Sequence, residues 1–299
     1  MLIQVAQTGI QTFCGLSLEW GAILIPTFAS IIVFLIGIII DKLNEFCRKK
    51  RETKEFRDTL FKWIELTQKA VKGQIDILNG FSDAIEANTT LQNERLTLSR
   101  NMVDKLDIVN AKNLIKYLIF NSSKPQNDRR AECVFNMISQ IDFLGSLEPE
   151  IRKQYDSYQK ESIALFDDWN SNIMSIQRLC AGKYSAEESD KMVEFISIVQ
   201  KWAEQTSGDS EVNVSQTMQL LMTPILNATK NHSFKQPGFE EVDLIKENAL
   251  QLKTVYDRWL SLSSGFSKVF REYARNANTA LTVLMSSKNY FLDSTKVVR

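Results

Sequence analysis

The feature that most constrains this chain is an uncharged apolar run from Gly21 to Ile40, GAILIPTFASIIVFLIGIII. A helix of this length covers about 30 Å, the thickness of the hydrocarbon layer of a bilayer. Thirteen of the 20 residues are Ile, Leu, Val or Phe, which together favour insertion by about 4–8 kcal/mol. We therefore predict a single transmembrane helix over residues 21–40, with Trp20 as an aromatic anchor at the membrane interface.

Two other kinds of segment can contain a long apolar run. A buried core helix of a soluble protein normally carries a polar stripe, and this run has none. A cleaved signal peptide begins with basic residues and ends in a small-residue cleavage site. Here no Lys or Arg precedes the run, which ends in three isoleucines followed by Asp41 and Lys42. Both features favour an anchor that is retained.

The charges flanking the run predict its orientation. Seven basic residues follow within the next 17 positions: Lys42, Arg48, Lys49, Lys50, Arg51, Lys54 and Arg57. The positive-inside rule then places residues 1–20 outside as a short non-cytoplasmic segment. Residues 41–299 would form a cytoplasmic domain, so the chain is predicted to be a single-pass membrane protein.

The rest of the chain is predicted to be all-α. Only 11 Gly and 5 Pro occur in 299 residues, and a fold rich in turns usually needs more of these turn-forming residues. Apolar residues step by three and four from Phe56 to Ile85 and, without a slip, from Val242 to Leu284. The second stripe predicts a helix of about 50 residues, about 75–80 Å long. A helix of that length needs another long helix beside it, and the helix after the membrane run is the natural partner.

The resulting prediction is an elongated, antiparallel multi-helix bundle with long, coiled-coil-like helices. Between the two stripes, glycine, proline and helix-capping residues predict the ends of several shorter helices. Gly145 is expected to end one of them, and Ser146 and Pro149 to begin the next. Ser185 and Glu188 fit a capping box for another. The expected helices cover about 129–144, 146–180, 185–205 and 213–229, with loops at 121–127, 206–210 and 231–238.

No catalytic or cofactor motif is visible. The sole histidine, His232, lies in a polar loop, and no phosphate-binding glycine motif occurs. The four cysteines, Cys14, Cys47, Cys133 and Cys180, form no CxxC pair. The net charge is zero, with 36 basic and 36 acidic residues, which argues against a general nucleic-acid binder. We expect no enzyme activity, metal, cofactor, nucleic acid or small-molecule substrate.

The basic run Arg48, Lys49, Lys50 and Arg51 is the one cluster with a ligand to suggest. It could bind anionic lipid headgroups, or it could serve only to orient the anchor. The acidic residues Glu45, Glu52 and Glu55 lower the positive potential around the run, which favours the role of orienting the anchor. Cys47 beside this run is a lipidation candidate.

The functional expectation is a non-enzymatic, membrane-anchored helical scaffold or subunit of a larger membrane-associated complex. Its partners would be the lipid bilayer and either a second protein or further copies of this chain, bound through the long helices. Two alternatives stay open. One is a transmembrane signal relay, and the other is a self-assembling, pore-forming protein whose spans pack through Ser30 and Gly37.

Overall fold

A computed structural model describes the backbone of residues 12–13, 16–87, 95–97, 110–120, 128–182, 189–206, 213–231 and 238–296. Side-chain surroundings are described for the same residues except 12–29, 189 and 293–296. The chain divides into two compact units. The first comprises Met1–Lys62 and Val109–Val134, and the second comprises Trp63–Ile108 and Phe135–Arg299.

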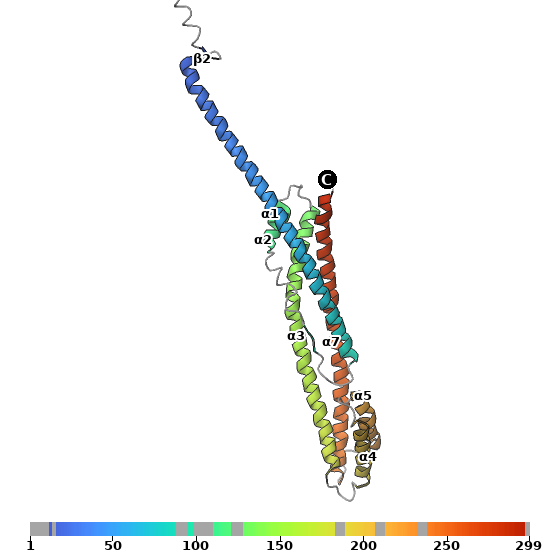
Figure 1. Cartoon of the computed structure of the whole chain (residues 1–299). Coiled ribbons are helices and arrows are strands. Elements are labelled where there is room, and N and C mark those ends of the chain that lie inside the picture. The colour runs from blue at the N-terminus through green and yellow to red at the C-terminus, as the bar shows by residue number, and fades with distance from the viewer. Residues whose placement is uncertain are drawn as a thin grey trace, which may run out of the picture. The chain divides into compact units, whose positions relative to one another are not determined.

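Nearly every described element is a helix (Figure 1). The exceptions are two-residue strands, β1 (Thr12–Phe13) and β2 (Leu16–Ser17), which pair antiparallel. Three helices are long: α1 (Leu18–Ala87) with 70 residues, α3 (Asp128–Cys180) with 53 and α7 (Glu240–Lys296) with 57. The prediction of an all-helical fold with long helices is confirmed for the described residues.

The first unit contains the beginning of α1, the short helix α2 (Ala111–Leu114) and the π-helix η1 (Ile115–Phe120). Phe56 of α1 stacks on Tyr117 of η1, with ring centroids 4.6 Å apart. Arg130 at the start of α3 donates a hydrogen bond to the backbone carbonyl of Leu118 at 2.6 Å. These contacts hold η1 against the neighbouring helices of its unit.

In the second unit α1 runs antiparallel to α7. Glu65 pairs with Lys288, whereas Glu86 pairs with Arg271, so the numbering falls along α7 as it rises along α1. From Ile64 to Ile85 the buried positions of α1 alternate by four and three, which is the spacing of a coiled-coil seam, with Ser82 as one additional buried position. The alternating positions are Ile64, Thr67, Val71, Gln74, Leu78, Phe81 and Ile85. The stripe predicted from Phe56 to Ile85 steps through Trp63, but the structure buries Ile64 there and leaves Trp63 half-buried; from Thr67 to Ile85 the predicted face is confirmed.

Aromatic rings fill the core where α1, α3 and α7 meet. Phe81 contacts Tyr155 and Tyr158 of α3 edge-on, at centroid distances of 5.7 and 5.8 Å. It also contacts Phe270 of α7 at 5.0 Å. Phe266 of α7 lies 5.4 Å from Tyr158. Such edge-to-face pairs contribute about 0.5–1.5 kcal/mol each beyond the area that they bury.

The first part of α7 packs against different elements from those that contact its second part. Short elements pack there against α7 and the end of α3: α4 (Ser189–Thr206), α5 (Val214–Thr217), the π-helix η2 (Met218–Met222) and α6 (Thr223–Ala228). Their shared core includes Phe195, Trp202 and Trp259. The Trp202 indole N–H donates to the Thr217 hydroxyl at 3.2 Å. The expectation that α7 packs along the helix that follows the membrane run therefore holds only for its second part.

The predicted break at Gly145 and Pro149 is wrong. α3 runs through both residues, which lie on its exposed side. Proline inside a helix costs about 3 kcal/mol. Leu144, Leu147 and Ile151 continue one buried stripe across the site, and each contributes about 1.5–3 kcal/mol by its burial. The free energy gained by burying this stripe in a continuous helix therefore exceeds the cost of the proline.

The predicted membrane segment lies within α1. None of the described residues forms a helical stretch both long enough and apolar enough to cross a bilayer. The side chains of residues 21–29, nearly half of the predicted span, lie outside the described part, as does the side chain of Trp20. The described residues therefore do not support the transmembrane helix, which stays a prediction.

Candidate functional site

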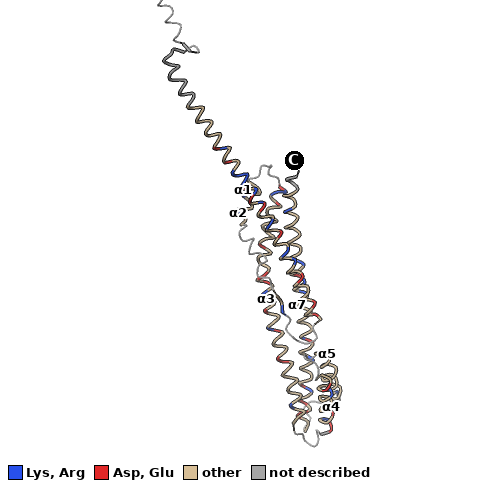
Figure 2. Tube along the Cα trace, in the orientation of Figure 1, with Lys and Arg blue, Asp and Glu red and all other residues tan. Residues whose placement is uncertain are grey.

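The most distinctive surface of the described chain is an apolar band on α1, which we define as Ile31–Ile40. Every large hydrophobic residue in it is exposed, from 38% at Ile38 to 68% at Val33 and Phe34. The band has no polar side, because all its residues other than Gly37 are Ile, Val, Phe or Leu. In Figure 2 it belongs to the stretch of α1 that carries no charge colour. Such a surface needs an apolar environment or a partner to cover it.

The predicted basic cluster follows the band on α1, and all four side chains are exposed. Successive residues of a helix point about 100° apart, so the four do not form one patch. Lys49 pairs with Glu45 at 2.6 Å and Arg48 pairs with Glu52 at 3.7 Å. The hydrogen bond from Lys49 holds the pKa of Glu45 below its usual value. Two of the four positive charges are thus shared with acidic neighbours.

The remaining sequence candidates form no site in the described residues. His232 and Cys14 lie outside the described part. The capping-box residues Ser185 and Glu188 lie outside it too. No group of His, Cys, Asp and Glu within the described ranges could hold a metal ion.

The described thiols differ in their surroundings. Cys47 is exposed, whereas Cys180 is buried in the core shared by α3, α4 and α7. This burial raises the pKa of Cys180 to about 11. Burial also raises the pKa of Cys133, which is half-buried. Cys180 is therefore a packing residue, while Cys47 is open to reagents.

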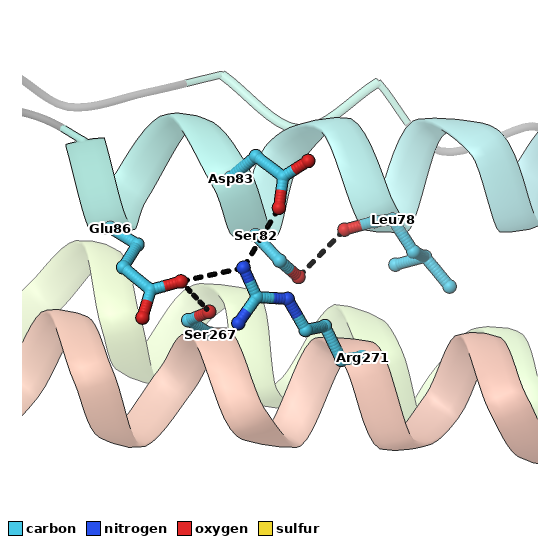
Figure 3. A network of polar contacts seen from close by, with 6 residues as sticks. All are labelled: Leu78, Ser82, Asp83, Glu86, Ser267 and Arg271. Atoms are coloured by element: carbon cyan, nitrogen blue, oxygen red, sulfur yellow. Dashed lines mark hydrogen bonds and ion pairs between the residues drawn. The ribbon is translucent and has the colours of Figure 1, made fainter.

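A polar network joins α1 to α7 in the second unit (Figure 3). Arg271 donates to Asp83 at 2.8 Å and also to Glu86. Ser267 lies one turn away on α7 and donates to Glu86 at 3.4 Å. The two carboxylates raise the pKa of Arg271. Because all three charged groups are exposed, water and salt weaken this link.

A second link between the same helices has one buried partner. Lys288 is only 4% exposed, and its ammonium donates to Glu65 at 2.6 Å. The Glu65 side chain is 62% exposed, so one end of the pair remains in water. The hydrogen bond from Lys288 lowers the pKa of Glu65. Sequence analysis missed this site, although Lys288 falls on the α7 stripe between Leu284 and Phe291.

No family model, curated protein or solved structure matches this chain. Function must therefore be argued from the surfaces described above.

Proposed function

We propose that this protein is a non-enzymatic helical scaffold, or a subunit of a larger complex, held at a membrane by one span over residues 21–40. The observation that carries the proposal is the exposed apolar band Ile31–Ile40. At about 0.3–0.6 kcal/mol per residue, its nine large side chains alone favour a bilayer by roughly 3–5 kcal/mol. Residues 1–20 would then lie on the non-cytoplasmic side and residues 41–299 on the cytoplasmic side.

The scaffold role draws on exposed apolar residues of the second unit. Ile163, Phe166 and Met174 of α3 are exposed and lie on one side of that helix. Residues three or four apart, or a multiple of a turn apart, share a helix face. Such a stripe is the kind of surface against which a helix of a partner protein packs.

The test separates the two surfaces. Full-length protein is expressed in its host membranes and extracted with alkaline carbonate. We expect the wild type to stay in the membrane and a Val33→Lys/Ile36→Lys variant to be released. Each lysine costs about 2.5–3.5 kcal/mol at the centre of a span.

An Ile163→Lys/Met174→Lys variant is the matched control, with the same two substituted charges on another exposed apolar surface. It should stay in the membrane and lose proteins that co-purify with the wild type in mild detergent. Wild-type protein that carbonate releases would refute the anchor. A wild type that purifies as a monomer without any partner would refute the scaffold.

A signal relay is the second candidate, favoured by the continuity of α1 from Leu18 to Ala87 and by its ion pairs with α7. A relay needs the α1–α7 contact to have two arrangements. Cysteines in place of Glu65 and Lys288 would report on it, after the native cysteines are replaced. Their oxidation rate should change between liposomes of different thickness if α1 moves, and an unchanged rate would reject the relay.

A further inference from the structure

The stretch of α1 that follows the apolar band has two chemically different sides. With about 100° between successive residues, Leu43, Phe46, Lys50, Lys54 and Arg57 lie within about 40° of one direction. We define these five residues as the basic–apolar face. It continues the apolar band along the helix, first with two large hydrophobic residues and then with three basic ones.

The acidic residues of this stretch lie on the other side. All four point about 140–180° away from the basic–apolar face: Asp41, Glu45, Glu52 and Glu55. Two of them hold Lys49 and Arg48 in ion pairs. Lys50 and Lys54 have no ion pair with any described residue, and Arg57 has only a 3.8 Å contact with Asp58. Lys42 and Arg51 have no ion pair with a described residue either, and they lie about 80–100° to either side of this face. The unneutralised positive charge is therefore centred on the basic–apolar face and absent from the acidic side.

The basic–apolar face is open over most of its length. Leu43 is 56% and Phe46 is 58% exposed, and Lys50 and Lys54 are exposed too. Only from Leu60 and Phe61 onward does α1 bury side chains. Hydrophobic residues next to the apolar band, followed by lysines on the same open side, are the pattern of a segment that leaves a membrane beside anionic headgroups.

We infer that the basic–apolar face is turned toward the headgroup layer of an anionic lipid leaflet, with Leu43 and Phe46 at the depth of the headgroups and Lys50 and Lys54 above them, where the lipid phosphates and carboxylates attract their charges. The inference rests on the proposed membrane anchor and adds the lipid class and the side of the helix that recognises it. Spanning helices tilt by about 20° on average. A tilt toward this face brings its lysines down to the anions and lifts the acidic residues away from them.

Helix geometry supports the choice of lipid. Phe46 lies about 9 Å beyond Ile40 along the axis, near the outer edge of a headgroup layer that is about 5–8 Å thick. Lys50 lies about 6 Å farther, within a Debye length of about 8–10 Å from the charged surface. Both hydrophobic side chains would gain an apolar contact that water does not provide. An acidic protein surface would attract the lysines but would not account for the direct continuation from the apolar band.

The first experiment measures burial depth at four positions in full-length protein reconstituted in liposomes. Each sample carries a fluorophore on one cysteine, at position 35, 43, 44 or 47, with the other native cysteines changed to serine. Brominated lipids quench the probe according to its depth. Leu35→Cys reports the anchor, Leu43→Cys and the native Cys47 lie on or beside the basic–apolar face, and Asn44→Cys points about 100° away from Leu43.

In vesicles of phosphatidylcholine with phosphatidylserine, we expect an excess of quenching at Cys47 above the value that a steady decline from position 43 through 44 would give, because a tilt of about 20° moves Cys47 toward the lipid and position 44 away from it. A helix that meets the membrane without a preferred side would show a steady decline from position 43 through 44 to 47, which would overturn the inference. Absence of quenching at position 35 would refute the anchor itself. Quenching at 35 combined with the steady decline would refute only the inference.

The second experiment tests the charges. A Lys50→Glu/Lys54→Glu variant should lose the excess quenching at Cys47 in anionic vesicles. Lys153→Glu/Lys160→Glu is the matched control, with the same charge change at two exposed lysines of α3, and it should retain the excess. Wild-type protein should also lose the excess in pure phosphatidylcholine. An excess that survives both the Lys50→Glu/Lys54→Glu change and the neutral lipid would show that anionic headgroups are not the ligand.

Discussion

The two halves of α1 belong to one continuous helix but present opposite surfaces. Over the apolar band the large hydrophobic residues are exposed on every side. From Ile64 to Ile85 the buried residues, apart from Ser82, recur at alternating intervals of four and three, and the other sides are mostly polar. A stripe can be covered by neighbouring helices, whereas an apolar surface on all sides needs an apolar solvent. Hydrophobic periodicity, rather than hydrophobicity alone, therefore separates the two halves.

The sharpest way to break this comparison is to truncate one phenylalanine in each half. Phe81→Ala should lower the free energy of unfolding by about 3–5 kcal/mol, because Phe81 is buried against three aromatic rings. Phe34→Ala should change it by less than about 0.5 kcal/mol, because Phe34 is exposed. Urea titration in detergent, followed by circular dichroism, measures both. Equal losses would mean that the band is packed against protein.

A smaller effect is expected where the second half of α1 meets α7. Glu65→Gln should lower the melting temperature more than Asp83→Asn does. The first change leaves the buried ammonium of Lys288 without a carboxylate, and the second leaves Arg271 exposed and still paired with Glu86. Differential scanning calorimetry of both variants decides the order, and a larger drop for Asp83→Asn would contradict it.

Replacing glycines by alanine in the two halves of α1 should change the free energy of unfolding by about 1 kcal/mol in one half and not in the other. Gly73 and Gly80 lie in the packed half of α1 and Gly37 lies in the band, and an added methyl group meets no atom within 4 Å at any of them. Gly73→Ala and Gly80→Ala should each raise the free energy of unfolding of the bundle by about 0.8–1 kcal/mol. Gly37→Ala should leave it unchanged if the band is not part of the cooperative unit. The same urea titration tests this, and a comparable gain at Gly37 would extend that unit into the band.

The last expected effect is a loss of stability at alkaline pH. The pKa of Cys180 is raised from its ordinary value of 9.0 to about 11. The folded state therefore keeps its proton while the unfolded state loses it, so the thiol reduces stability as the pH rises from about 9 to 11. Cys180→Ala should flatten this part of the stability profile. At pH 8 an alkylating reagent should label exposed Cys47 and leave Cys180 largely unmodified in the folded protein, as mass spectrometry of peptides would show.

The long helices were predictable because their signal repeats over many turns. The α7 stripe from Val242 to Leu284 and the α1 face up to Ile85 each have enough apolar positions to outweigh local exceptions. The helix break predicted at Gly145 and Pro149 was wrong. A helix tolerates a proline on its exposed side when its buried stripe continues past that proline. Whether a break occurs there depends on tertiary packing, which a local pattern does not contain.

The covering of α7 and the site at Lys288 could not be predicted for a related reason. Short helices from α4 to α6 replace a long partner over the first part of α7, and nothing in the α7 stripe distinguishes the two coverings. Lys288 follows the stripe as an apolar residue would, but its burial depends on a carboxylate 223 positions away in the chain. The apolar band and the basic residues after it needed no such information, since they lie in one continuous segment.

The buried ammonium of Lys288 also favours one alignment of α7 along α1 over its neighbours. In the native alignment it meets Glu65. A slip of about one helical turn in either direction would bring it instead to Lys62 or Lys69. Both alternatives replace attraction by repulsion in a place that excludes water from one partner. A bundle of long, similar helices offers many nearly equivalent alignments, and these two lysines disfavour the two alignments nearest to the native one.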